Sequence, residues 1–223
     1  MSKAVVLLSG GLDSSTTLGI ANEEHDEIFA LTFKYGQKHD KEIQCAKELA
    51  NHYSVEEHII LETDLKKIAK SSLINDDDIP ASDEEDIGKS IPTTYVPARN
   101  IIFLSYALSY SESLDAKAIY IGATAVDYSG YPDCRPEFFK AFKTMAKKGT
   151  KRGVEDKMVD VKTPLIDKSK SEIIKIGDDL SVPFEKTWSC YRGREKACGT
   201  CDSCKLRLKG FDESGLKDPL VYE

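Results

Sequence analysis

The sequence contains no apolar run that approaches the roughly 18 residues of a membrane-spanning helix, and its N-terminus lacks the pattern of a signal peptide. One lysine precedes five apolar residues, and a serine and two glycines follow them at once. We therefore expect a cytoplasmic protein without a membrane partner. The chain also lacks an excess of basic residues, because 38 acidic residues outnumber 31 basic ones and the net charge is −7. This balance argues against nucleic acid as a partner of the whole surface.

Two common phosphate-binding motifs, G-x4-G-K-[ST] and G-x-G-x-x-G, are also absent. Instead, Ser9-Gly10-Gly11-Leu12-Asp13-Ser14 directly follows the apolar run of residues 4–8, which predicts a buried strand that turns into a helix. The N-terminus of such a helix offers unpaired backbone N–H groups to an anion. An ordinary strand–turn–helix capped by Asp13 or Ser14 is the alternative. Because no lysine follows the glycines to reach a terminal phosphate, the loop suits a diphosphate bound as a unit.

Strand-like and helix-like segments alternate along the chain. The predicted strands cover residues 3–8, 28–33, 58–61, 118–121 and 159–162, and the predicted helices cover residues 12–21, 38–53, 64–73, 98–112, 136–147 and 169–180. The last helix opens with the capping box Ser169-x-x-Glu172. This alternation predicts an α/β fold in which helices cover both faces of a parallel, doubly wound sheet. We assign residues 1–185 to this domain and residues 186–223 to a small C-terminal segment. Residues 75–86 carry seven acidic side chains and no basic one, which predicts a mobile, solvated loop.

Cysteine is sparse, and four of the six cysteines lie in the C-terminal segment as C-x7-C-x2-C-x2-C: Cys190, Cys198, Cys201 and Cys204. In a cytoplasmic chain this pattern indicates a metal site rather than disulfides. Four thiolates suit tetrahedral zinc and leave no position open for water, so we expect a structural zinc ion. An iron–sulfur cluster and a redox pair of Cys198 and Cys201 are the alternatives. Seven basic residues against two acidic ones lie between positions 186 and 210.

The loop at residues 9–14 resembles the PP-loop of the ATP pyrophosphatase (adenine nucleotide α-hydrolase-like) superfamily. Such enzymes cleave ATP between its α and β phosphates, adenylate a carbonyl or carboxylate oxygen, and release diphosphate. The resemblance implies ATP bound with Mg²⁺, and Asp13 is the nearest carboxylate that could hold this ion or its waters. The implied ATP-binding residues are Leu8, Ser9, Gly10, Gly11, Leu12, Asp13, Ser14, Ser15, Thr16, Thr17 and Leu18.

Further strings extend the resemblance over essentially the whole chain. They are Phe33-Lys34-Tyr35-Gly36-Gln37-Lys38-His39, Val96-Pro97-Ala98-Arg99-Asn100, Asp127-Tyr128-Ser129-Gly130-Tyr131-Pro132-Asp133-Cys134-Arg135-Pro136, Thr163-Pro164-Leu165 and Trp188-Ser189-Cys190-Tyr191. In this order they resemble the family of 7-cyano-7-deazaguanine synthases, with Ala98 at a position where glycine is expected as often.

The resemblance implies a ligase of queuosine-precursor biosynthesis that forms C–N bonds. It converts 7-carboxy-7-deazaguanine and ammonia to the nitrile through an amide, and each of two adenylations gives AMP and diphosphate. Arg99 is expected to contact ATP phosphates or the substrate carboxylate, or else to form a surface salt bridge. Asp127 is expected to accept hydrogen bonds from the base, and Arg135 to pair with the substrate carboxylate. Tyr128 and Tyr131 are expected to stack on the base or to pack a loop. The family also implies a homodimer.

Three other functions are compatible with the sequence. A PP-loop tRNA thiolation enzyme would use the cysteines as sulfur carriers, and the basic C-terminal segment could then bind RNA. A zinc-ribbon binding module on an α/β scaffold would have no ATP turnover. An amidotransferase-type synthetase needs an added glutaminase domain, for which 223 residues are too few. We therefore expect free ammonia as the nitrogen donor.

Overall fold

The computed structural model describes residues 1–75, 79, 81, 90–126 and 130–223. Its centre is a five-stranded sheet with the strand order β3-β2-β1-β4-β5, in which every neighbouring pair is parallel. The strands are β1 (Lys3–Leu7), β2 (Glu27–Lys34), β3 (Glu57–Glu62), β4 (Ala118–Ile121) and β5 (Asp160–Lys162). The predicted parallel α/β fold is therefore confirmed, and all five predicted strands are present.

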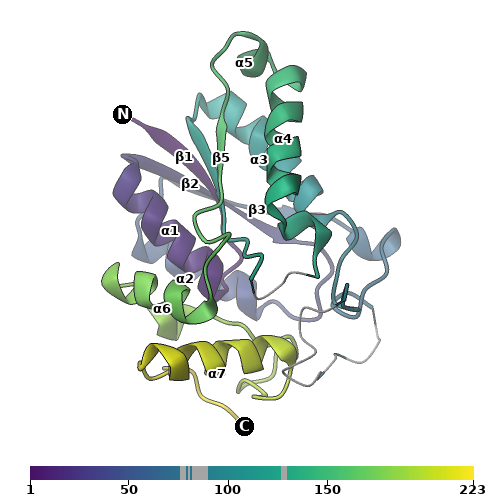
Figure 1. Ribbon diagram of the computed structural model, residues 1–223, viewed down its shortest axis with the longest axis vertical. Coiled ribbons are helices and arrows are strands. Elements are labelled where there is room, and N and C mark those ends of the chain that lie inside the picture. The colour runs from purple at the N-terminus through teal and green to yellow at the C-terminus, as the bar shows by residue number, and fades with distance from the viewer. Residues whose placement is uncertain (76–78, 80, 82–89, 127–129) are drawn as a thin grey trace.

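Helices cover both faces of the sheet (Figure 1). On one face, α1 (Leu12–Glu24) and α2 (Lys41–His52) pack against alternate strand residues such as Val6 and Ala30. On the other face, α3 (Arg99–Leu114) and α4 (Pro136–Gly149) pack against Val5 and Leu31. Because successive side chains of a strand point to opposite faces, the continuous apolar run of β1 supplies both cores.

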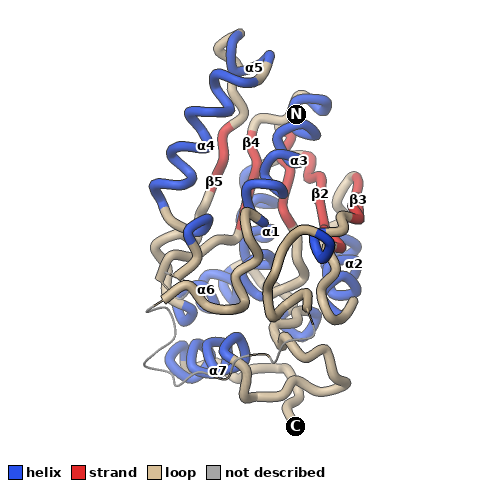
Figure 2. The backbone as a smooth tube through the Cα atoms, turned by 90° about the vertical axis from the view of Figure 1, so that its right-hand side faces the viewer, coloured by secondary structure: helices blue, strands red, loops and turns tan. Residues whose placement is uncertain are grey.

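The C-terminal part of the chain lies beyond the carboxyl ends of the strands (Figures 1 and 2). After the short α5 (Lys151–Val154), α6 (Lys170–Asp179) begins at the predicted capping box, in which Ser169 and Glu172 bond reciprocally. Helix α7 (Asp202–Ser214) packs on α6 through a third apolar cluster that includes Phe211 and Ile173. The C-terminal segment therefore rests on the α/β domain through α7.

The predicted helix at residues 64–73 is wrong. The structure forms only a 3₁₀ turn at η1 (Leu65–Lys67), and Ile68 is 81% exposed. The Ser72 amide and the Ser71 hydroxyl instead donate to the Thr93 carbonyl oxygen, at 2.9 and 3.1 Å. These bonds to a distant segment replace the helical ones, which explains why the helix stops. The acidic stretch 75–86 lies almost entirely outside the described residues.

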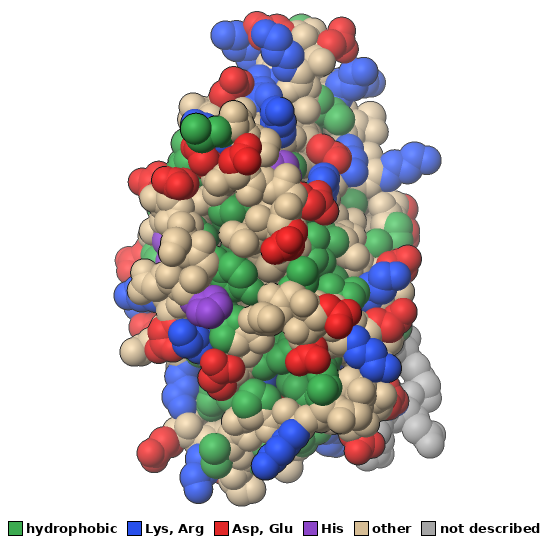
Figure 3. All heavy atoms as spheres, turned by 90° about the vertical axis from the view of Figure 1, so that its left-hand side faces the viewer, with side chains coloured by type: hydrophobic (Ala, Val, Ile, Leu, Met, Phe, Trp, Pro, Cys, Tyr) green, Lys and Arg blue, Asp and Glu red, His purple; other side chains and the backbone are tan. Residues whose placement is uncertain are grey.

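The strand order reverses direction between β1 and β4, which is where open α/β sheets bind ligands. The loop after β1 and the residue after β4 touch there, because a Cβ at Gly122 would lie 2.8 Å from the Asp13 carbonyl oxygen. Over the face of the molecule in Figure 3, acidic and basic side chains are interspersed. Among the residues described, no helix combines the length and the apolar character needed to cross a membrane.

Candidate functional site

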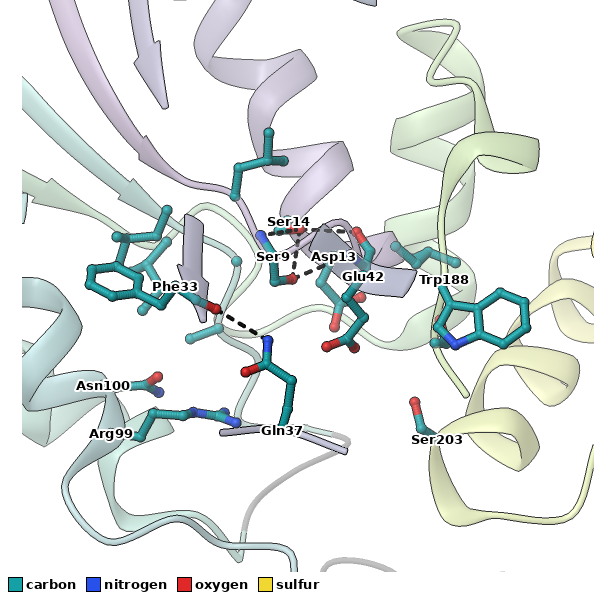
Figure 4. A pocket seen from close by; sticks show the side chains of 18 of the residues that line it. Ser9, Asp13, Ser14, Phe33, Gln37, Glu42, Arg99, Asn100, Trp188 and Ser203 are labelled. Carbon is teal, nitrogen blue, oxygen red and sulfur yellow. Dashed lines mark hydrogen bonds between the residues drawn. The ribbon is translucent and has the colours of Figure 1, made fainter. Parts of the chain in front are cut away.

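A cavity of about 250 Å³ opens at the carboxyl edge of the sheet. Among the parts of the chain that line it are the loop after β1, the segment after β2, the first turns of α2 and α3, and the C-terminal segment around Trp188 (Figure 4). Three of these parts come from strings that carried the family resemblance. The cavity brings together sequence positions that lie more than 100 residues apart, so the fold creates the site.

The loop between β1 and α1, residues 9–15, is fixed by its own hydroxyl groups; we call it the phosphate loop. The Ser9 amide donates to Ser14 Oγ at 3.2 Å, the Gly11 amide donates to Ser9 Oγ at 3.2 Å, and the two serine hydroxyls lie 2.9 Å apart. Ser14 and Ser15 both donate to the Gly11 carbonyl oxygen, at 3.0 and 2.8 Å. Gly11 itself occupies the N-cap position and no side chain caps the helix, so neither Asp13 nor Ser14 has the capping role. The first turn of α1 therefore has no side-chain cap and lies at the cavity, and unpaired backbone N–H groups at a helix start can bind an anion.

The Asp13 carboxylate forms a nearly buried ion pair with Lys170, the first residue of α6. Lys170 Nζ lies 2.7 and 2.8 Å from the two carboxylate oxygens, and its side chain is 9% exposed. Both residues line the cavity. The phosphate loop has no lysine of its own, and the fold supplies one from 157 positions further along the chain.

Arg99 opens helix α3 and lines the same cavity. Its guanidinium lies 5.7 Å from the Tyr35 ring centroid and donates to the Tyr35 hydroxyl at 3.4 Å. Burial disfavours its charge, but Tyr35, Tyr131 and nearby acidic groups outweigh burial and raise the pKa of Arg99 above its usual value. Among the residues described, no carboxylate pairs with it at salt-bridge distance, so the predicted surface salt bridge is not formed.

The start of α3 is held by the η3 turn (Pro132–Cys134). The Asn100 amide donates to an Asp133 carboxylate oxygen at 3.0 Å, and the Asn100 side chain donates to the Asp133 carbonyl oxygen at 3.1 Å. The preceding residue, Ala98, adopts φ 58° and ψ 19° in the left-handed region. Glycine adopts this region without strain, which gives the physical reason for expecting glycine at position 98.

The four cysteines of the C-terminal segment converge; we call Cys190, Cys198, Cys201 and Cys204 the cysteine cluster. All four are buried, and their sulfur atoms lie within 4.8 Å of one another. Tetrahedral Zn–S bonds of about 2.3 Å place sulfur atoms about 3.8 Å apart, and Cys198 Sγ lies 4.0 Å from Cys204 Sγ. Backbone amides donate to Cys190 Sγ and Cys198 Sγ at 3.3–3.4 Å, which favours thiolates. This donor set fits one tetrahedral metal ion.

The cysteine cluster is joined to the phosphate loop through the Trp188 stretch. The Trp188 amide donates to the Gly10 carbonyl oxygen at 2.9 Å, and its indole Nε1 donates to the Cys190 carbonyl oxygen at 2.8 Å. The Lys41 ammonium lies 4.1 Å from the Trp188 ring centroid, within the range of a cation–π contact. The metal-binding segment therefore forms one wall of the cavity.

The structure brings some of the predicted site residues into the cavity and leaves others outside. Leu8, Ser9, Gly11, Leu12, Asp13 and Ser14 line it, as do Arg99 and Tyr131. Ser15, Thr16, Thr17 and Leu18 are buried in α1, and Gly10 packs against α2. Arg135 is exposed at the N-cap of α4 and does not line the cavity. Asp127 and Tyr128 lie outside the described residues.

Glu42 and Lys170 are among the charged residues of the cavity that are absent from the predicted site residues. Each stands in the first turn of a helix whose existence the sequence does predict. Since helices that follow parallel strands begin at the carboxyl edge of the sheet, their first turns are the signal that could have identified both residues.

The chain matches the family model described as "Queuosine biosynthesis protein QueC" over residues 3–215. It is 54% identical over 221 residues to the 7-cyano-7-deazaguanine synthase of Thermoplasma acidophilum, an alignment that covers 99% of this chain and 92% of that protein. It is 52% identical to 7-cyano-7-deazaguanine synthase 2 of Desulfitobacterium hafniense, with 100% and 94% covered. The enzyme of the same name from Citrifermentans bemidjiense is also 52% identical, with 99% and 98% covered.

Among solved structures, the NMN synthetase of Francisella tularensis has a similar fold. The superposition has a TM-score of 0.50 at 15% sequence identity and covers 96% of this chain and 77% of that one. At this identity the likeness concerns the fold alone. It agrees with the PP-loop fold that residues 9–14 predict.

Proposed function

The chain belongs to the QueC family of queuosine biosynthesis proteins, and on this premise we propose that it makes 7-cyano-7-deazaguanine from 7-carboxy-7-deazaguanine, ammonia and ATP. The reaction would proceed through an adenylated carboxylate, an amide and a second adenylation. A carboxylate is inert to ammonia until its oxygen becomes a leaving group, and removing the amide oxygen needs the same activation. The scheme therefore consumes two ATP and gives two AMP and two diphosphates.

The observation that carries the proposal is one cavity lined both by the uncapped start of α1 and by Arg99, which forms an ion pair with no carboxylate of the described residues. The phosphate loop suits the diphosphate part of ATP, whose negative charge grows as it leaves. The Arg99 guanidinium can bind the planar carboxylate of the substrate or the α-phosphate with two parallel hydrogen bonds. Tyr131 lines the cavity nearby and offers an aromatic face to a flat base.

Four cations of the described residues stand in the cavity wall, of which Lys170 is paired with Asp13 and Arg207 with Asp218. Arg99 and Lys38 are the cations that would meet ATP. Lys38, Arg99, Lys170 and Arg207 line the cavity, against Asp13 and Glu42 among the described residues. The Asp13 carboxylate accepts two hydrogen bonds from Lys170, and its remaining lone pairs could accept water molecules of Mg²⁺. When bound with ATP, Mg²⁺ would neutralise phosphate charge. In this assignment, Lys170 fixes the orientation of the Asp13 carboxylate within the phosphate loop.

We further propose that Asp127 reads the base edge and that Arg135 approaches the substrate carboxylate when substrate is bound. The cysteine cluster would hold one zinc ion with a structural role, because four sulfur ligands leave no position for a reactant. A homodimer and a cytoplasmic location complete the proposal, and light scattering during size-exclusion chromatography tests the first of these.

Mass spectrometry tests the reaction directly. The protein is incubated with ATP, an ammonium salt and 7-carboxy-7-deazaguanine, and a parallel sample omits ammonium. We expect the nitrile in the complete sample, with two AMP formed for each nitrile, and no nitrile in the control. ADP and phosphate without AMP would overturn the adenylation scheme, and no turnover of the carboxylic acid would overturn the proposed substrate.

A further inference from the structure

Glu42 is an acidic residue of the cavity that the proposed scheme does not yet use. It stands in the first turn of α2 and lines the cavity together with Asp13, the other acid of the described lining. Asp13 is held by Lys170, whereas the Glu42 carboxylate forms no hydrogen bond or ion pair with any other described residue. Figure 4 shows Glu42 projecting into the cavity close to Ser9 and Asp13. A cavity-facing carboxylate without a partner is open to a cationic ligand.

The position of Glu42 is fixed against the phosphate loop. Gly10 adopts φ +87°, and a Cβ there would overlap the Glu42 carbonyl oxygen and lie 2.8 Å from the Ala46 amide nitrogen. The backbone of α2 thus packs directly on Gly10, with no side chain between them. This contact fixes the α2 backbone from which the Glu42 side chain enters the cavity, next to the loop where the acyl phosphate would form and break.

The surroundings of Glu42 allow it to change charge near neutral pH. Burial raises its pKa to about 7, against the attraction of the Arg99 guanidinium, and the Cys190 sulfur adds a smaller effect in the same direction as burial. The first-turn position in α2 opposes burial, because a helix N-terminus favours a negative charge. The other titratable or charged groups that share the cavity are Asp13, Tyr35, Lys38, His39, Tyr131, Cys134, Lys170, Tyr191 and Arg207.

We propose that the Glu42 carboxylate binds the ammonium ion and accepts its proton, so that ammonia attacks the adenylated substrate. This assignment rests on the proposed function. Ammonia in neutral water is almost wholly ammonium, which has no lone pair for attack. A carboxylate that pairs with no other described residue supplies both the counter-charge for this cation and the base.

The atoms and charges of the step balance. Glu42 takes one proton from ammonium and becomes neutral. The nitrogen lone pair then forms the C–N bond to the acyl carbon, and the bond from this carbon to the AMP oxygen breaks with its electrons left on the phosphate. The phosphate takes a second proton from nitrogen, so the products are the amide, AMP and protonated Glu42. Glu42 returns its proton to water before the next turnover.

The variant Glu42→Gln tests the proposal because the reaction can be entered at two points. With 7-carboxy-7-deazaguanine, ATP and ammonium, the path to the amide needs the base. With the amide supplied and no ammonium, the conversion to the nitrile takes no proton from ammonium, although two protons still leave the amide nitrogen. Exchange of labelled diphosphate into ATP in the presence of the carboxylic acid, without ammonium, follows adenylation alone.

We expect Glu42→Gln to slow amide formation by about 100-fold or more, the usual range for a lost general base, with a raised KM for ammonium. Diphosphate exchange should stay within about three-fold, because adenylation of the carboxylic acid takes no proton from nitrogen. Amide-to-nitrile conversion should slow less than amide formation, because no ammonium ion has to be bound and deprotonated. Glu42→Asp should restore part of the amide formation. The matched control is Glu48→Gln, which changes an exposed acid on the same helix and should match the wild type in all three assays.

Two results would overturn the assignment. If Glu42→Gln forms the amide as fast as the wild type, the carboxylate is not the base. If it loses diphosphate exchange and the second half-reaction equally, its role is to hold the phosphate loop. If instead the wild type forms neither amide nor nitrile, the proposed function fails, and the assignment of Glu42 fails with it.

Discussion

Replacing Gly10 with alanine tests the contact between the phosphate loop and helix α2. The backbone at Gly10 has φ +87°, and a Cβ would overlap the Glu42 carbonyl oxygen and lie 2.8 Å from the Ala46 amide nitrogen. A Cβ in the left-handed region destabilises the folded protein by about 1–2 kcal/mol. Alanine also lowers the conformational entropy of the unfolded chain, which offsets about half of this destabilisation. Overpacking against backbone atoms costs about 1–3 kcal/mol more. We therefore expect Gly10→Ala to lose about 2–4 kcal/mol of unfolding free energy.

Gly215→Ala is the matched control. Gly215 has a similar φ of +77°, but a Cβ there would meet nothing within 4 Å. This variant should therefore lose only the backbone part, about 1 kcal/mol or less. Denaturant unfolding at a fixed zinc concentration measures both variants, and ATP affinity should fall in Gly10→Ala alone. Equal losses of stability and unchanged ATP affinity in both variants would refute the close packing of α2 on the phosphate loop.

The Asp13–Lys170 pair, the cysteine cluster and the buried Glu42 carboxylate lead to three further predictions. Lys170→Met leaves the largely buried Asp13 carboxylate without its partner, so thermal unfolding should show that the free energy of unfolding falls by about 3 kcal/mol. Adding Asp13→Asn to this variant should recover part of the lost stability, and no recovery would contradict the ion pair. A chelator should release one zinc ion per chain, which mass spectrometry measures. Loss of the ion should raise the rate of amide hydrogen exchange in α7, and an unchanged rate would contradict a structural role for the ion. Burial raises the pKa of Glu42 from its ordinary value of 4.5 to about 7, so the native state keeps a proton that the unfolded chain loses between these values. Stability should fall as pH rises through this window, by up to about 3 kcal/mol, and Glu42→Gln should remove this part of the pH dependence; an unchanged profile would contradict the shift.

The elements that the sequence predicts correctly are those with a local signal. The run Ala4 to Leu8 is apolar at every position, and Ser169-x-x-Glu172 forms a capping box from four neighbouring residues. The wrong helix at residues 64–73 shows the limit of such signals. Its end is set by bonds from Ser71 and Ser72 to Thr93, a residue that no local pattern connects to them.

The residues of the candidate site likewise fall into those that a local sequence pattern predicts and those that depend on tertiary packing. The glycines and serines of the phosphate loop and the spacing of the cysteines are local patterns, and both predict chemistry from the sequence alone. The Asp13–Lys170 pair depends on α6 packing beside α1, and the place of Glu42 depends on α2 packing against Gly10. Such contacts between distant residues can be predicted only when the strand order and the helix positions are known. The sequence therefore predicts the binding motifs better than it predicts the charged side chains that surround them.

The spacing C-x7-C-x2-C-x2-C has a structural reason once the fold is known. Cys198, Cys201 and Cys204 form a tight turn that leads into α7. Cys190 stands eight positions earlier because its stretch also contacts the phosphate loop, where the Trp188 amide bonds to the Gly10 carbonyl oxygen and the Trp188 indole bonds to the Cys190 carbonyl oxygen. Trp188 therefore lies only two positions before Cys190, so a single residue separates the backbone contact with the phosphate loop from a sulfur of the cysteine cluster. A metal ion on the cysteine cluster would take no part in the proposed chemistry but would fix one wall of the cavity, so its removal should weaken ATP binding.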